Sequence, residues 1–556
     1  MAIDLRKWSL MICLSLLVLQ VPGVTPGLAQ TSTPSYQVFA FNDLGMHCYD
    51  SDFSVAAVLP PYNVVRAQVL LKGQHPQFLD PAQVKLSYRA VADPTGSINR
   101  TSVNKTNFWT YVQDLFGVTL AVDVGVKGYR MPGSANRAQL MAEYDPQMRW
   151  FGAEGIPITA FDDAGVRNTL PLMQVRAQDK ATGTLLSSLK TVVPASDEMN
   201  CSNCHVTGGI AANQATVSRH GLTRPWSANP DLGLQTKENV LILHDGINRT
   251  SLTANQPVLC ASCHYSAALD LAGQGPQGAQ AGKPQLSHAI HTRHGKTIDN
   301  ALPDAAHPAI IAANNTNACY QCHPGQVTKC LRGAMATANI SCQGCHGGML
   351  AVGGFYNLRT TGQPRQPWKD LPKCQSCHTG DAVSHAGKAL VLRQAYVTSD
   401  PAATPRNAAN KRFAEENNTL YRFSLGHNGV ACQSCHGSPH AEWPTRNGTN
   451  DNIAARQIQG HTGPIIECAS CHGNNLPRTI NGPHGLHNIN DPNWYDGGHE
   501  SFAENNRDNC RACHGQRGEG TALSKVAAAR VLQSEGQHSL AKGTPVSCNL
   551  CHENPL

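Results

Sequence analysis

The stretch GVACQSCHGSPHAEW, residues 429–443, places two cysteines and a histidine in the order C-x-x-C-H and adds a second histidine four residues later. The same C-x-x-C-H motif occurs nine times in the 556 residues of the chain. The motifs begin at residues 201, 260, 319, 342, 374, 432, 468, 510 and 548. They use eighteen of the twenty-one cysteines, so one repeated chemistry organises the chain from residue 201 onward.

Three chemistries use a C-x-x-C pair. Structural zinc takes four ligands, usually from two such pairs, and gives no reason for a histidine after every pair. A thioredoxin-like dithiol needs one motif at a strand–helix junction and not nine. Attachment of a c-type haem explains the whole motif, because two thiols bond the vinyl groups of the porphyrin and the adjacent histidine binds the iron.

On these nine motifs, residues 201–556 resemble the large multihaem c-type cytochromes of bacterial respiratory and extracellular electron transfer. The resemblance implies nine covalent c-type haems in a domain of short helices and loops wrapped around them. The expected thioether cysteines are Cys201, Cys204, Cys260, Cys263, Cys319, Cys322, Cys342, Cys345, Cys374, Cys377, Cys432, Cys435, Cys468, Cys471, Cys510, Cys513, Cys548 and Cys551. The expected proximal iron ligands are His205, His264, His323, His346, His378, His436, His472, His514 and His552.

The second axial position of each iron decides between electron transfer and substrate chemistry. Sixteen histidines lie outside the motifs, which exceeds the nine distal positions, and we expect mainly bis-histidine, low-potential haems. Methionine is the alternative ligand and would raise the potential. The candidate distal ligands are His244, His288, His291, His294, His427, His440, His461, His484, His487, His499 and His538. His440 lies too near His436 to reach the far face of the same haem, so we expect it to serve a neighbouring one.

Residues 30–200 contain no motif and show another pattern. The segments YQVFAFND (36–43), NVVRAQVLLKG (63–73) and QVKLSYRAVA (83–92) alternate apolar and polar residues as strands do. The segment at 171–194 reads as two strands joined by a turn. We therefore predict an N-terminal haem-free all-β domain, sandwich-like, that serves for docking or for stability.

Residues 201–556 should form the nonahaem domain, with a sub-boundary near 380–425. The spacing of the motifs follows no fixed period, and the sequence between them is rich in Gly, Pro, Asn and Ser, with a helical candidate at 521–533. Such segments cannot close an apolar core unaided, so the porphyrins are expected to supply the missing buried surface.

The first residues predict export. A charged lead at 4–7, an apolar run of about fourteen residues from Trp8 to Val21 and a small-residue site at 27–29 form a signal peptide over residues 1–29. Cys13 lies inside the apolar run and lacks the context of a lipid-modified cysteine. The mature protein is expected in the periplasm or at the cell surface, and no later stretch is long enough to span a membrane.

The net charge of +6 comes from basic residues that are scattered along the chain. Because they form no basic cluster, we expect no nucleic-acid partner. Removal of the signal peptide leaves about +5, and nine haems with ionised propionates would bring this to about −4.

Cys48 and Cys330 remain outside the motifs. In an oxidising compartment they predict a disulfide that ties the β domain to the haem domain. Two alternatives stay open, namely a mononuclear metal site at Met46, His47 and Cys48, and His47 as a distal haem ligand.

The function that this sequence predicts is an electron relay between redox partner proteins, including an outer-membrane or extracellular acceptor. The resemblance also covers multihaem reductases and oxidases of the nitrite, hydroxylamine or sulfur-oxyanion type, which would need one five-coordinate haem. It further covers oligomers and conductive filaments.

Overall fold

The computed structural model of the chain describes residues 35–199, 201–270, 272–297 and 420–440, most of 319–371, and 453–553 apart from 474, 475 and 477–481. The expected signal peptide, almost all of the expected sub-boundary and the motif with Cys374, Cys377 and His378 lie outside the described residues.

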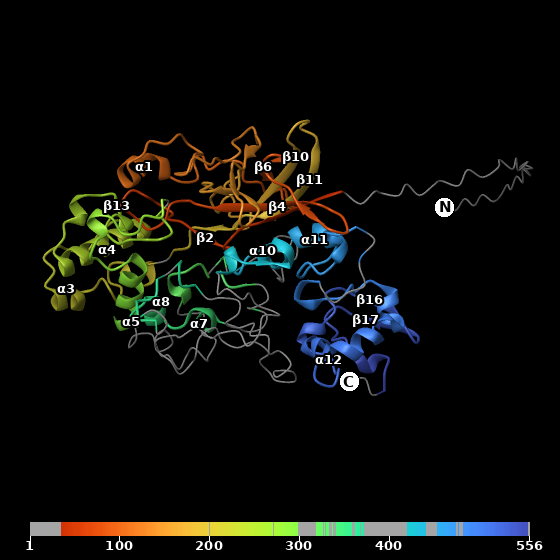
Figure 1. The fold of residues 1–556 in the computed structure, drawn as a ribbon. Coiled ribbons are helices and arrows are strands. Elements are labelled where there is room, and N and C mark those ends of the chain that lie inside the picture. The colour runs from red at the N-terminus through yellow and green to blue at the C-terminus, as the bar shows by residue number, and fades with distance from the viewer. Residues whose placement is uncertain are drawn as a thin grey trace, which may run out of the picture.

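The N-terminal part is built from two antiparallel sheets that share one apolar core (Figure 1). The first sheet has the order β1-β4-β9-β8, with β5 also paired to β4. Its strands are β1 (Tyr36–Phe41), β4 (Val64–Leu71), β5 (Gln77–Phe78), β8 (Glu143–Asp145) and β9 (Trp150–Glu154). The second sheet, β11-β10-β6-β7, contains β6 (Val84–Val91), β7 (Gln139–Leu140), β10 (Leu172–Asp179) and β11 (Leu185–Val192). The predicted β region is therefore present as two antiparallel sheets, but it is not all-β, because it also contains helix α1 (Phe108–Phe116).

Alternation in β6 explains how the second sheet covers the core. Val84, Leu86, Tyr88 and Ala90 are buried, while the residues between them are partly exposed. Successive side chains of a strand point to opposite faces, so this strand has one core face and one solvent face. The sequence pattern predicted this strand for that reason.

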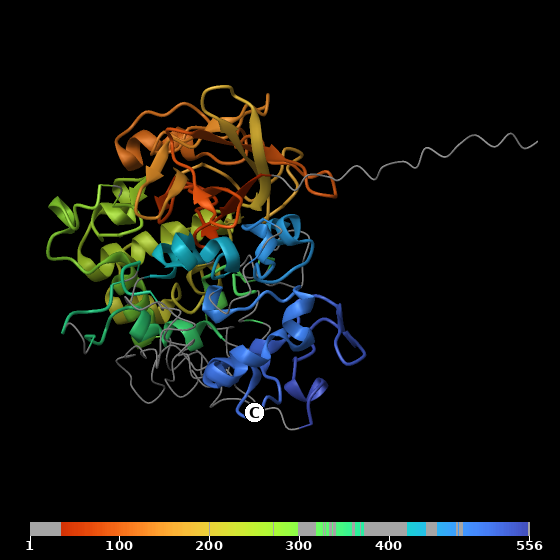
Figure 2. The ribbon, with the colours of Figure 1, turned by 45° about the vertical axis from the view of Figure 1, so that its right-hand side comes forward.

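Strand β4 differs, because seven of its eight residues are buried. Val65, Ala67 and Val69 belong to the shared core, so Arg66 and Gln68 lie on the opposite face. That opposite face is covered by helix α10 (Cys432–His436), which lies against the sheet in Figures 1 and 2. A motif from the far end of the sequence thus completes the burial of an N-terminal strand.

Other late segments also join the β region. Helix α11 (Ile453–Gln459) packs on β11, where the Gln457 side chain accepts from the backbone N–H of Lys190 and donates to its carbonyl. Strand β13 (Val258–Leu259) pairs in parallel with β3 (Ala56–Ala57). The two regions predicted as separate domains are thus joined by hydrogen bonds at several points.

Beyond residue 200 the described residues form short helices and turns between loops. The longest helices are α4 (Leu232–Asn248) and α12 (Glu500–His514), and several others span four or five residues. No helix within the described ranges is both long enough and apolar enough to cross a membrane. The general prediction of a β region followed by short helices and loops is confirmed.

The helix predicted at 521–533 is wrong. The structure has one 3₁₀ turn at Ala522–Ser524 and then strand β16 (Arg530–Gln533), which pairs with β17 (Gln537–Leu540). Gly536 at the turn has φ of 126°, which suits a glycine in a tight hairpin. Pairing with the next segment therefore outweighs the helical propensity of the alanines.

Candidate functional site

Each described C-x-x-C-H motif lies on one short helical turn. In five motifs the histidine N–H bonds the carbonyl of the first cysteine at 2.9–3.0 Å, as in the bond from His264 to Cys260. The first of these five forms α2 (Ser202–His205), with Cys201 at its N-cap. The other three motifs lie in α7 (Cys342–His346), in α10 and at the C-terminal end of α12. Positions i, i+3 and i+4 of a helix lie on one side, so the turn presents both thiols and the imidazole together.

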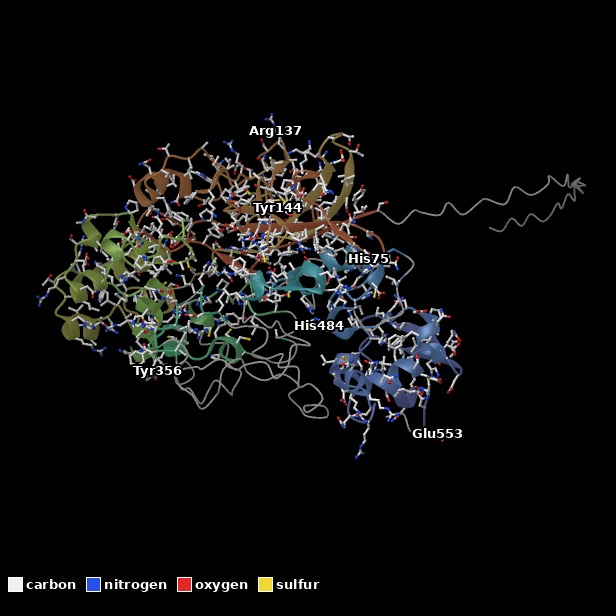
Figure 3. All side chains as sticks on the ribbon, in the orientation of Figure 1. His75, Arg137, Tyr144, Tyr356, His484 and Glu553 are labelled. Atoms are coloured by element: carbon white, nitrogen blue, oxygen red, sulfur yellow. The ribbon has the colours of Figure 1, made fainter. Side chains whose placement is uncertain are left out.

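Eight motif histidines are described, and each has a second histidine from outside the motifs beside it. The pairs are His205–His294, His264–His244, His323–His291, His346–His440, His436–His484, His472–His427, His514–His487 and His552–His499. Their ring centroids are 5.7–6.4 Å apart. His484 can be followed in Figure 3 below the α10–α11 region.

This separation is the one that two imidazoles on opposite sides of one metal would have. A metal–nitrogen bond of about 2.0 Å and about 1.1 Å from nitrogen to ring centre give about 6.2 Å between centroids. The angle between the ring planes, by contrast, varies from 9° in His291–His323 to 89° in His205–His294. A fixed distance with a free angle is what two ligands of one metal would give, and it differs from a preferred ring–ring contact.

Hydrogen bonds fix the tautomer of several paired histidines. Nδ1 of His264 donates to the Pro284 carbonyl at 2.8 Å, and Nδ1 of His472 donates to the Gln74 carbonyl at 3.1 Å. The same bond is made by Nδ1 of His291, His294, His499 and His514 to backbone carbonyls. A carbonyl only accepts, so Nδ1 carries the proton and Nε2 carries the lone pair, which is the usual arrangement behind a metal-binding histidine.

Burial favours the neutral form of two of the paired histidines, His205 and His487. Burial, and then the partner imidazole, lowers the pKa of His205 to about 4 and that of His487 to about 4. Burial likewise raises the pKa of the Cys260 thiol to about 12. The turns thus hold uncharged imidazoles and thiols, the forms that haem ligation and thioether formation require.

The donor set fits haem better than a bare ion. Within the described ranges no group of three or more His, Cys, Asp or Glu side chains is arranged to hold a metal ion. Each histidine pair could hold a haem iron with two imidazole nitrogens, and the porphyrin would supply the other four ligands. Zinc in a structural site would need four protein ligands instead.

Three candidate distal ligands have other neighbours. His461 uses both ring nitrogens, because Nδ1 lies 3.0 Å from the Thr462 carbonyl and Nε2 lies 3.0 Å from a Glu467 carboxylate oxygen. Nε2 of His538 donates to the Ser534 carbonyl at 2.9 Å. His288, in a turn of π-helix at His288–Thr292, stands beside no motif histidine among the described residues.

His47 is not brought next to a motif histidine in the part of the chain that the structure describes. Its Nε2 lies 3.4 Å from Oδ1 of Asp43, and its ring lies 5.9 Å from that of Tyr62. Met46 is buried nearby, but no three-ligand group forms among the described residues. The structure therefore favours neither alternative use of His47.

The structure brings the chain around Cys330 to the strand that holds Cys48. Strand β2 (His47–Cys48) pairs with β12 (Ala195–Ser196), and the Ser196 hydroxyl lies 3.4 Å from that of Thr328. Backbone N–H groups of Val327 and Thr328 donate to Glu198 at 2.8 and 2.9 Å. Both cysteines are thiols in this structure, and burial raises the pKa of each, that of Cys330 to about 12.

We expect Cys48 and Cys330 to form a disulfide under oxidising conditions. After denaturation without reductant, neither cysteine should take up an alkylating agent, and after reduction both should. Peptide mass spectrometry reads the two labels separately from the thioether cysteines. Labelling of both without reductant would contradict the expectation.

Sequence reasoning missed the role of the β region at these turns. Gln68 of β4 contacts the turn that holds the motif at 432, and the Gln74 carbonyl fixes His472. The only sequence signal is that Val64 and Leu70 share the outer face of β4 with Arg66 and Gln68, and that face is too apolar to be exposed to solvent.

No family model, no curated protein and no solved structure matches this chain.

Proposed function

We propose that this chain is an exported electron-transfer protein that carries nine covalent c-type haems, each held by a C-x-x-C-H motif and most by a second histidine. The observation that carries the proposal is the constant 5.7–6.4 Å separation of eight motif histidines from eight others. A pair of histidine ligands closes both axial positions of an iron and favours electron transfer over substrate binding.

The burial pattern supports the same proposal. Of the twelve largest fully buried side chains in the described residues, eleven lie at or before Met173 and the other is Gln433. The region that carries the motifs thus buries few large apolar side chains of its own, and a porphyrin would supply that surface. When bound, the haems supply the one-electron chemistry, and the chain supplies ligands, burial and spacing.

The proposed partners are redox proteins that donate electrons in the periplasm and a protein or acceptor at the cell surface. Nine haems on residues 201–556 must lie close together, which favours transfer between neighbours. The alternative of a reductase needs an iron with an open axial position. Since eight motif histidines have a partner, that iron would have to be the one at His378.

The purified mature protein tests this proposal directly. Its mass should exceed that of the polypeptide by nine haems, and the haems should stay attached in denaturant. A protein of bare polypeptide mass that contains zinc would overturn the proposal. High-spin iron that binds cyanide would show an open position and favour the reductase alternative.

The angles between the paired rings predict two classes of low-spin signal in electron paramagnetic resonance (EPR). Parallel imidazole planes split the iron d orbitals that interact with the rings more than perpendicular planes do. His291–His323 at 9° and His487–His514 at 15° should give the first class. His205–His294 at 89° and His244–His264 at 79° should give the second. A single class across the oxidised protein would contradict the pair geometry while leaving haem attachment intact.

A further inference from the structure

We infer that Gln68, a residue of the haem-free β region, is a positioning residue for the segment where three haem sites meet. The inference rests on the proposed function. It assigns the β sandwich an internal role, because the face of β4 that carries Gln68 is covered by the motif region and is not open to a docking partner.

The segment in question, residues 425–440, supplies histidines to three different pairs. His427 lies beside His472, His436 lies beside His484, and His440 lies beside His346. The motifs at 342, 432 and 468 therefore share this one segment, which we call the junction segment. Any change in its position moves ligands of three proposed haems at once.

Gln68 binds the junction segment with both ends of its amide. The side-chain NH₂ donates to the carbonyls of Gly429 at 3.0 Å and Met148 at 2.8 Å. The side-chain oxygen accepts from the Ala431 N–H and the Ser434 hydroxyl, both at 2.9 Å. Gln68 is 0 % exposed, so the full hydrogen-bonding capacity of the amide is used on protein groups. The amide links β4 to the residues on both sides of Cys432.

The backbone that presents His427 needs such support. Strands β14 (Leu425–Gly426) and β15 (Val430–Ala431) form a hairpin whose turn has positive φ at His427 (29°), Asn428 (62°) and Gly429 (99°). The left-handed region is unfavourable for residues other than glycine and persists where surrounding contacts hold it. Gln68 holds the Gly429 carbonyl, and Arg149 donates to that of Asn428 at 3.1 Å.

Further contacts tie the loop that follows β1 to the rest of the junction segment. The Gln433 side chain donates to the Asp43 carbonyl at 2.7 Å, and the Ser438 hydroxyl donates to the Asn42 carbonyl. These bonds keep the segment on the sheet when one contact is removed, so loss of Gln68 should shift the segment without releasing it. The expected effect is therefore on ligand geometry and not on haem attachment.

The test is Gln68→Leu in the full-length holoprotein, with Gln174→Leu as the matched control. Gln174 lies on β10 in the other sheet and accepts one bond, from Arg89 at 3.0 Å. Leucine is similar in size to glutamine but cannot bond Gly429, Ala431 or Ser434. We expect Gln68→Leu to shift the reduction potentials and EPR lines of the three junction haems. Gln174→Leu should shift none.

Haems remote from the segment provide the internal reference. The EPR lines of the proposed haems at His244–His264 and His499–His552 should be the same in Gln68→Leu as in the wild type. The comparison is made under conditions in which circular dichroism shows both proteins to be fully folded. Ser434→Ala removes one of the four bonds and should give a smaller shift of the same lines. It serves as the second variant if Gln68→Leu does not accumulate as folded protein.

The outcomes separate this inference from the proposed function. A wild-type protein without covalent haem overturns the proposed function. A nine-haem protein whose lines are identical in wild type, Gln68→Leu and Ser434→Ala overturns the inference alone. Equal shifts at all haems, remote pairs included, also overturn it, because they indicate general loosening and not positioning.

Discussion

Replacing His440 with alanine is expected to convert one of the nine proposed haems from a six-coordinate low-spin form to a high-spin form. The reason is that the ring centroid of His440 lies 6.1 Å from that of the motif histidine His346. Its ring also bonds the backbone of Leu44, and burial lowers its pKa to about 4, so it is a fixed and neutral imidazole. EPR of the oxidised protein should show the loss of about one ninth of the low-spin intensity and the gain of a high-spin signal that cyanide removes.

The matched control is His461→Ala. The sequence predicted His461 as a ligand because it precedes Cys468 by seven residues. Its ring nitrogens are instead used by Thr462 and Glu467, so its removal should leave all haems low-spin and cost some local stability. A high-spin haem in His461→Ala, or none in His440→Ala, would refute the pairing given by the structure.

The difference between His440 and His461 shows which ligands can be predicted from the sequence and which cannot. The motifs could be predicted because covalent attachment fixes the spacing of Cys, Cys and His along one helical turn. Distal ligands have no such rule, since any part of the fold can deliver them. The partner of His472 is His427, which precedes it by 45 residues, and not the much nearer His461. Glu467, directly before Cys468, was the one local sign that His461 had another partner.

The β region shows the same limit. Alternation along Val84–Val91 predicted a strand with one buried face, and the structure has that strand. The burial of Gln68 on β4 depends on residues 429–434, more than 360 positions away. The apolar outer face of β4 indicates that something covers it, but no local pattern could predict which segment does. The composition of the two regions predicted separate domains. The hydrogen bonds that join them connect segments far apart in the chain, and the sequence alone does not predict such bonds.

Without haem attachment, most of the chain after residue 200 is expected to be unfolded while the β sandwich remains. The sandwich has its own core, which includes Phe151, Ile156 and Met173. Apart from α12, the α-helices around the cysteines of the motif region span four or five residues, far shorter than the ~12–15 residues that an isolated helix needs. Its few buried apolar side chains cannot offset the entropy of ordering so many loops.

The experiment is limited proteolysis of full-length protein made in cells without the haem-attachment machinery, beside holoprotein made with it. In the haem-free protein about two-thirds of the chain, residues 201–556, should be digested, leaving a resistant fragment near residues 35–199. The holoprotein should resist throughout the regions with paired histidines. The fragment should also unfold at a lower temperature than the holoprotein, since β4 then loses the cover of α10 and the bond from the Ser434 hydroxyl to Gln68. A haem-free chain that resisted digestion after residue 200 as well as the holoprotein does would mean that the polypeptide alone forms this core, and the porphyrins would lose the structural role argued for them.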